Sequence, residues 1–199
     1  MAERERSSEE YGNVDLVGDE TVKMVAASAM FAALTAALAQ VSIPMPAGMP
    51  PVTVQTTAVF LAGLLLGARW AGFSMVLYLL TGAAGAPVFA NGSGGFGSLV
   101  GYTGGFLFGY LLAAVVIGAV VHRGLGRRPL SQVSVVTQVG AVVLGIAIIY
   151  VLGTPWMASV LGLSMQKAFA TMLPYLPGDL IEMAAVVALV RAGDLDGMV

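Results

Sequence analysis

Three charged side chains in the C-terminal part of the chain stand alone and offer its most specific chemistry. Between Pro129 and Val190 only Lys167, Asp179 and Glu182 are charged, and the residues around them are mostly apolar or small. Burying an unpaired charge in an apolar setting costs several kcal/mol, so such residues usually face a cavity or a partner. A cation there can pair with an anionic ligand group, and carboxylates can accept hydrogen bonds or relay a proton.

The two carboxylates are predicted to share one face of a helix. Pro177 suits the first helical position, which places Asp179 in the first turn and Glu182 one turn later. The helix dipole favours a carboxylate in a first turn, so a purely stabilising role for Asp179 is one alternative. An ion pair between Lys167 and either acid is another. The residues alone leave these alternatives open beside ligand binding and proton relay.

Two loops rich in proline or glycine supply uncharged candidates. Pro44–Thr53 holds four prolines that stiffen the backbone, and Gln55 follows it. In Gly85–Gly101, glycines let backbone amides approach a ligand closely, and Asn91 can both donate and accept hydrogen bonds. A flexible turn, or bonds from Gln55 to nearby backbone, would account for these residues equally well. Tyr102 and Thr103 follow the second loop and could reach a ligand at its mouth.

Enzymatic activity is the function least favoured by the sequence. The chain has no phosphate-binding loop of the Gly-x4-Gly-Lys-Ser/Thr type and no cysteine, hence no thiolate metal site. The only histidine, His122, stands near arginines at the end of a predicted helix, where we expect a solvated surface side chain. We therefore predict no catalytic residues, no metal site and no cofactor.

The elements that must position these residues are membrane helices. The chain is 58% hydrophobic and 10% charged, whereas soluble domains carry about 25% charged residues. Its apolar runs are continuous rather than alternating, which indicates helices instead of a membrane barrel. A tight charged turn from Gly67 to Gly72 separates two of the runs, and a short helix is expected near Leu163–Met172. The predicted spans are Val22–Ile43, Val54–Ala68, Trp70–Ala86, Tyr102–His122, Val133–Gly153 and Leu176–Arg191.

The cations predict the orientation of these spans. With the N-terminus inside and six crossings, eight of the nine Lys and Arg residues fall on the cytoplasmic side. Lys167 alone falls outside, together with the two loops and the start of the last span. Seven of the eleven acids lie in the first 20 residues. We therefore expect an acidic cytoplasmic tail at 1–20, a six-helix membrane domain at 21–193 and a C-terminal tail at 194–199.

Seven short motifs lie in a specific order between about Lys23 and Arg191. They are Ala29–Leu34, Pro51–Thr56, Leu61–Gly67, Gly85–Ala90, Gly94–Gly97, Thr103–Phe106 and Pro177–Leu180. Each is weak alone, but the ordered set resembles BioY, the biotin-binding S component of energy-coupling-factor (ECF) vitamin transporters. The chain departs from that family at Glu182, where a lysine often stands, which puts a role for a cation at this place in doubt.

The resemblance implies an all-α integral membrane protein with the ECF S-component fold, six transmembrane helices and both termini cytoplasmic. It implies capture of biotin at the outer face of the cell membrane. It also implies transport powered by a partner complex of a transmembrane coupling subunit and two ATPase subunits. Ala29 and Ala33 would form the docking face for the coupling subunit, with packing inside the chain as the alternative. A homo-oligomer stays open, and no nucleic-acid partner is expected.

Biotin has a ureido ring with two N–H donors and one carbonyl, an apolar thioether ring and a carboxylate tail. From the resemblance and this complementarity, we expect Asp179 to accept from the ureido N–H groups, Asn91 to accept and donate, and Lys167 to pair with the carboxylate. The further candidates for ligand binding are Phe89, Tyr102, Tyr175, Thr103 and Gln55. The alternatives are an ion- or proton-coupled carrier or channel that uses Asp179 and Glu182, and an S component for another vitamin.

Overall fold

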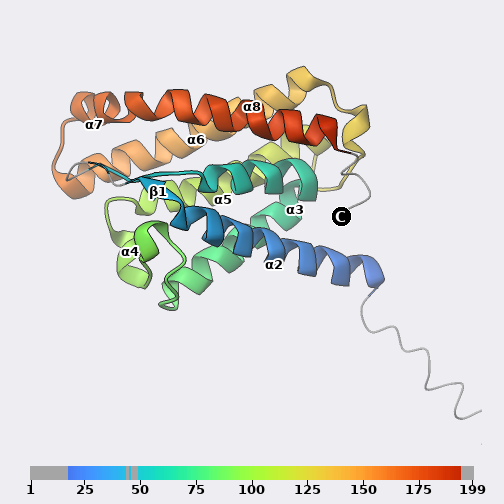
Figure 1. Ribbon diagram of the computed structural model, residues 1–199, viewed down its shortest axis with the longest axis horizontal. Coiled ribbons are helices and arrows are strands. Elements are labelled where there is room, and N and C mark those ends of the chain that lie inside the picture. Colours follow the sequence, from blue (N-terminus) through green and yellow to red (C-terminus); the bar gives the residue numbers. More distant parts are fainter. Residues whose placement is uncertain (1–17, 44, 46–48, 194–199) are drawn as a thin grey trace, which may run out of the picture.

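The computed structural model describes residues 18–43, 45 and 49–193, which form a bundle of helices (Figure 1). The helices are α2 (Asp19–Gln40), α3 (Gln55–Ala83), α4 (Phe96–Val100), α5 (Gly104–His122), α6 (Val135–Leu161), α7 (Met165–Met172) and α8 (Leu176–Ala192). A short antiparallel pair joins β1 (Ser42–Ile43) to β2 (Val52–Thr53), and 3-10 turns occupy Ala90–Gly92, Leu130–Gln132 and Leu173–Tyr175. Most of the predicted N-terminal tail and all of the predicted C-terminal tail lie outside the described residues.

Five helical stretches in the described part are long and apolar enough to cross a membrane. They are Asp19–Gln40, Gln55–Ala83, Gly104–His122, Val135–Leu161 and Met165–Ala192. The prediction of a helical, multi-span membrane protein is therefore confirmed. Two of the six predicted spans, Val54–Ala68 and Trp70–Ala86, correspond to the two helical arms of α3 on either side of Gly67. The cytoplasmic location of both termini stays a prediction.

The helix α3 turns sharply at Gly67. Gly67 has φ +76° and ψ 170°, a backbone region that side chains disfavour and glycine adopts readily. The Tyr78 hydroxyl lies 3.2 Å from Gln55 Oε1 across 23 positions of sequence, a distance of about 34 Å along a straight helix. The arms 55–66 and 68–83 therefore form a V whose ends meet, and Figure 1 shows the chain turning back. The predicted tight turn is confirmed at its first residue.

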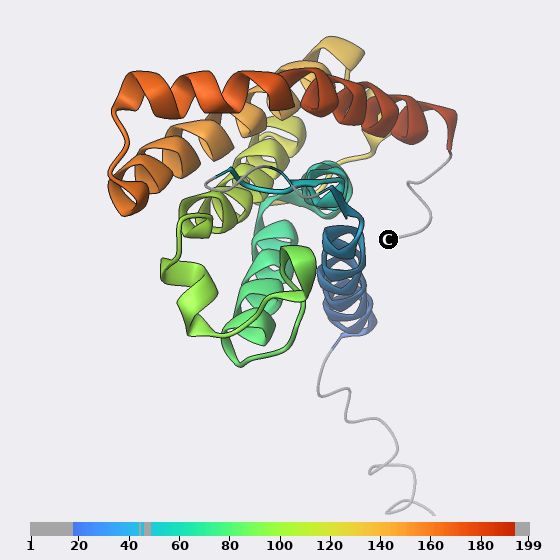
Figure 2. The same cartoon turned by 60° about the vertical axis from the view of Figure 1, so that its left-hand side comes forward.

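The other helices pack around this V. The helix α5 packs between α3 and α6, and α2 packs along α3. Close approach of α5 to the bend depends on Gly118, because a Cβ there would collide with the backbone of Ala68. Figures 1 and 2 show α7 and α8 nearly in line across one side of the bundle, beside α6. The predicted short helix near Leu163–Met172 corresponds to α7.

His122 is buried, so the prediction of a solvated surface histidine was wrong. Only 6% of its surface is exposed. Its Nδ1 accepts a hydrogen bond from the Arg128 backbone N–H (3.1 Å), so its Nε2 carries the ring hydrogen and donates to the Leu64 carbonyl (2.8 Å). Leu64 lies in the last turn before the bend at Gly67, where helix carbonyls lose their regular partners. His122 thus caps the first arm of α3.

Candidate ligand-binding cavity

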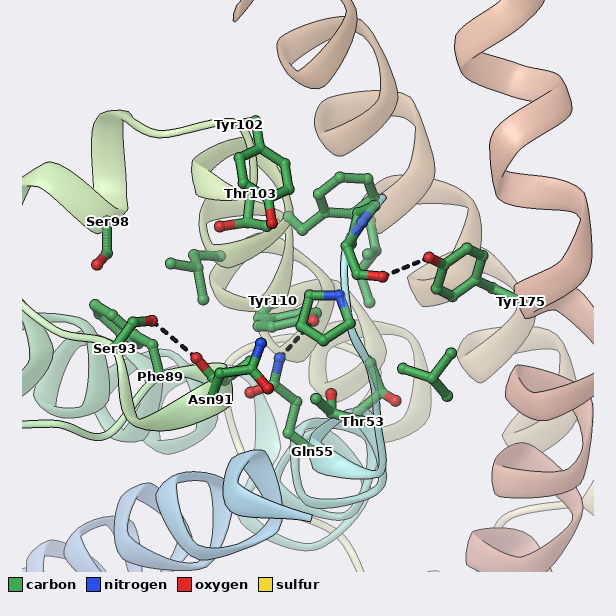
Figure 3. A pocket seen from close by; sticks show the side chains of 18 of the residues that line it. Thr53, Gln55, Phe89, Asn91, Ser93, Ser98, Tyr102, Thr103, Tyr110 and Tyr175 are labelled. Atoms are coloured by element: carbon green, nitrogen blue, oxygen red, sulfur yellow. Dashed lines mark hydrogen bonds between the residues drawn. The ribbon is translucent and has the colours of Figure 1, made fainter. Parts of the chain in front are cut away.

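A cavity of about 390 Å³ opens where the two loops meet the first turns of α3, α5 and α8 and the middle of α6. This volume falls in the range typical of small-molecule sites. Figure 3 shows side chains from these separate elements converging on it. Seven of the eight predicted ligand-binding residues line it: Gln55, Phe89, Asn91, Tyr102, Thr103, Tyr175 and Asp179. The eighth, Lys167, is exposed on α7 and lies outside the lining.

Asp179 lies at the start of α8 and is held by a tyrosine of α6. Pro177 occupies the first turn of that helix, so the chain can begin the helix without losing a backbone hydrogen bond. The Tyr150 hydroxyl donates a hydrogen bond to Asp179 Oδ2. A carboxylate can accept several hydrogen bonds, so Asp179 keeps acceptor capacity toward the cavity. The position in the first turn also suits the helix dipole, and the two roles are compatible.

Glu182 lies one turn further along α8 and also lines the cavity. Its Oε2 accepts hydrogen bonds from the hydroxyls of Thr56 (2.5 Å) and Thr57 (2.8 Å). Both threonines belong to the first turn of α3, so Glu182 fastens α8 to that helix. Within the described residues no ion pair joins Lys167 to Asp179 or Glu182, so the predicted structural alternative for these charges is not found.

A buried polar cluster forms the inner wall of the cavity. Gln55 is only 4% exposed; its amide nitrogen donates to the Tyr110 hydroxyl (2.8 Å), and its amide oxygen accepts from Tyr78 (3.2 Å). Because the Tyr110 oxygen accepts from Gln55, its own hydrogen is available to a ligand acceptor. Phe89 packs edge-on against Tyr78, with ring centroids 5.3 Å apart, and adds an apolar surface.

Asn91 presents its side chain from the glycine-rich loop. Its φ of +59° lies in the left-handed region, which asparagine tolerates better than most residues. The Ser42 hydroxyl donates to Asn91 Oδ1 (2.7 Å), which leaves the amide N–H groups for another acceptor. On the opposite side, the Tyr175 hydroxyl donates to the Pro50 carbonyl and ties the first loop to the junction of α7 and α8. Figure 3 shows Asn91 and Tyr175 on different sides of the cavity.

Two tyrosines of the cavity were missed by reasoning from the sequence. Tyr110 on α5 and Tyr150 on α6 each place a hydroxyl in an apolar helix, where a buried hydroxyl needs a hydrogen-bond partner. A tyrosine hydroxyl inside an apolar helix was therefore the sequence signal that could have identified Tyr110 and Tyr150. Their partners, Gln55 and Asp179, come from other helices, and their proximity depends on the packing of the bundle.

Ala29 and Ala33, the predicted docking residues, lie on the outer face of α2. Both are exposed, as are the neighbouring Met30 and Leu34. Packing inside this chain, the alternative for these alanines, is therefore not found for the two residues. The exposed face is smooth and apolar, and it can contact either lipid or another membrane helix.

Comparisons with known proteins agree on one family. The BioY family model matches residues 8–195. The biotin transporter BioY of Rhodobacter capsulatus is 40% identical over 172 residues, which covers 81% of this chain and 88% of that protein. The biotin transporter BioY of Thermotoga maritima is 37% identical over 163 residues, which covers 80% of this chain and 90% of that protein.

A solved structure has the same architecture. The crystal structure of the S-component for biotin from an ECF-type ABC transporter matches with a TM-score of 0.79 and 25% identity. The match covers 88% of this chain and 93% of that chain.

Proposed function

Because the chain belongs to the BioY family, we propose that it binds biotin in the cavity described above, as the S component of an ECF-type transporter. It is a multi-pass membrane protein of a transporter family, and not an enzyme. The relatives described above are biotin transporters. We therefore favour biotin binding over the two alternatives, an ion-coupled carrier and an S component for another vitamin.

The observation that carries the proposal is the match between the cavity and the ureido ring of biotin. Asp179 offers carboxylate acceptor capacity for the ureido N–H groups, and a hydrogen bond to a charged group is stronger than a neutral one. Asn91 and Tyr110 offer N–H and O–H donors to the ureido carbonyl. Phe89 and Phe106, which both line the cavity, offer apolar surface to the thioether ring.

We place the rest of the transporter in partner proteins. The exposed face around Ala29 and Ala33 suits close packing against a helix of a transmembrane coupling subunit, because small residues let helices approach. Two ATPase subunits would supply the energy, since this chain has no phosphate-binding loop. With both termini in the cytoplasm, the cavity opens toward the outside of the cell.

A calorimetric titration of the purified, detergent-solubilised protein tests the proposal. We expect saturable 1:1 binding of biotin and no measurable binding of thiamine or riboflavin, whose rings lack the saturated ureido group. Absence of biotin binding by folded protein would overturn the proposed function. Equal binding of all three vitamins would overturn the assignment of biotin as the ligand.

Replacing Tyr150 by phenylalanine should weaken biotin binding by about threefold to tenfold. The change removes the hydroxyl that holds Asp179 Oδ2 but keeps the ring and its packing. Calorimetry of the variant gives the affinity directly. Ser159→Ala is the matched control, because it removes an exposed hydroxyl of the same helix, outside the cavity. Unchanged affinity in Tyr150→Phe would show that this hydroxyl does not position Asp179 for the ligand.

A further inference from the structure

The lining of the cavity is acidic. Among the described residues that line it, Asp179 and Glu182 are the only ones with a formal charge, and none is lysine, arginine or histidine. Biotin at neutral pH carries a carboxylate on its tail. An anionic tail drawn toward these acids would meet charges of its own sign instead of a counter-ion.

Lys167, the only cation predicted on the outer side, faces away from the cavity. Met172 of the same helix lines the cavity, and Ala168 and Met172 form the buried side of α7. Lys167 lies five residues before Met172, which corresponds to about 140° around a helix with 3.6 residues per turn. Its side chain is exposed accordingly. Lys167 therefore supplies no positive charge to the lining of the cavity.

Glu182 is fixed in place and cannot easily move away from the ligand. Two threonine hydroxyls donate to one of its oxygens, and both belong to the first turn of α3. The carboxylate is half-buried at a point where a lysine side chain would bring positive charge into the cavity. The groups left for a ligand tail are neutral ones at the rim, such as the exposed Ser93 and the half-buried Ser98.

We infer that this cavity recognises biotin by its ring system and not by the charge of its tail. The inference rests on the proposed function and deepens it, because it adds biotin derivatives with a neutral tail to the ligands of the site. These neutral derivatives are amides and esters of the biotin carboxyl group. In these molecules the ureido and thioether rings are unchanged, while the negative charge is gone.

Titrations of the wild-type protein with biotin and with biotinamide test this inference. We expect biotinamide to bind within tenfold of biotin, or more tightly. Losing one partner of a desolvated ion pair typically lowers affinity by about thirtyfold or more, so a tenfold limit separates the two cases. Biotinamide binding more than tenfold weaker than biotin would overturn the inference but leave the proposed function standing. If neither molecule binds to folded protein, the proposed function fails and the inference falls with it.

Charge variants provide an independent test. Glu182→Lys places a cation beside the ligand, so the ratio of biotin to biotinamide affinity should rise at least tenfold above the wild-type ratio. Glu182→Gln, which removes the charge without adding one, is the matched control and should change the ratio less. Lys167→Ala should leave the ratio unchanged, and it keeps the inference testable if Glu182→Lys does not fold. A selective loss of biotin affinity in Lys167→Ala would show that this lysine reaches the tail.

Discussion

Asp179→Asn should weaken biotin binding by about tenfold to a hundredfold while the protein stays folded. The amide keeps the shape of the side chain, but it replaces a charged acceptor by a neutral group that also carries donors. Hydrogen bonds to charged groups contribute about 1.5–3 kcal/mol, and each 1.4 kcal/mol is a factor of ten in affinity. Asp179 lines the cavity beside Tyr150. The substitution should therefore weaken the hydrogen bonds that Asp179 accepts from the ureido N–H groups.

Calorimetry of the purified variant measures this loss, and thermal unfolding in the same detergent checks that the fold is retained. Asp19→Asn is a matched control, because Asp19 is an exposed carboxylate at the start of α2. Its affinity for biotin should equal that of the wild type. Wild-type affinity in Asp179→Asn would remove Asp179 from the binding site.

Gly67→Ala should lower the free energy of unfolding by about 1–3 kcal/mol. The φ of +76° with ψ of 170° lies in a region that is essentially restricted to glycine. A Cβ at this position would also lie only 3.2 Å from Arg127 Cγ and 3.2 Å from the Gly126 carbonyl oxygen. Because the bend brings the two ends of α3 together, biotin affinity should fall as well.

Thermal unfolding with and without biotin measures both effects of Gly67→Ala. Gly140→Ala is the control: this glycine lies in α6, and nothing crowds the position of its missing Cβ. Alanine favours a helix over glycine by up to about 1 kcal/mol, so this variant should be as stable as the wild type or slightly more so. A Gly67→Ala protein with unchanged stability would contradict the view that the bend requires glycine.

The helices and the bend were predictable because they depend on local sequence. Long apolar runs indicate membrane helices whatever their neighbours are, and the glycine of Gly67-Ala68-Arg69 marks the place where the chain turns. The first turn of α8 was predictable from local sequence as well, because Pro177 and Asp179 both favour the start of a helix. The two short apolar runs predicted as separate spans correspond to the two arms of α3, because the non-helical Gly67 divides that element.

Side-chain partners between distant helices could not be predicted in the same way. The predicted topology puts Lys167 on the outer side together with Asp179. The face of α7 on which the Lys167 side chain lies depends on how that helix packs, which the sequence does not indicate. His122 looked like a surface residue because its sequence neighbours are polar, yet the bend at Gly67 leaves a carbonyl that it caps. Tyr150 was missed because its partner lies 29 positions away.

The most direct test of the central claim is a crystal structure of this protein bound to biotin. We expect the ureido ring inside the cavity, with at least one ureido nitrogen about 2.7–3.2 Å from a carboxylate oxygen of Asp179. The carbonyl should point toward Asn91 or Tyr110, and the tail should lie at the rim. Biotin bound outside this cavity, or bound with its ureido ring away from Asp179, would contradict the account.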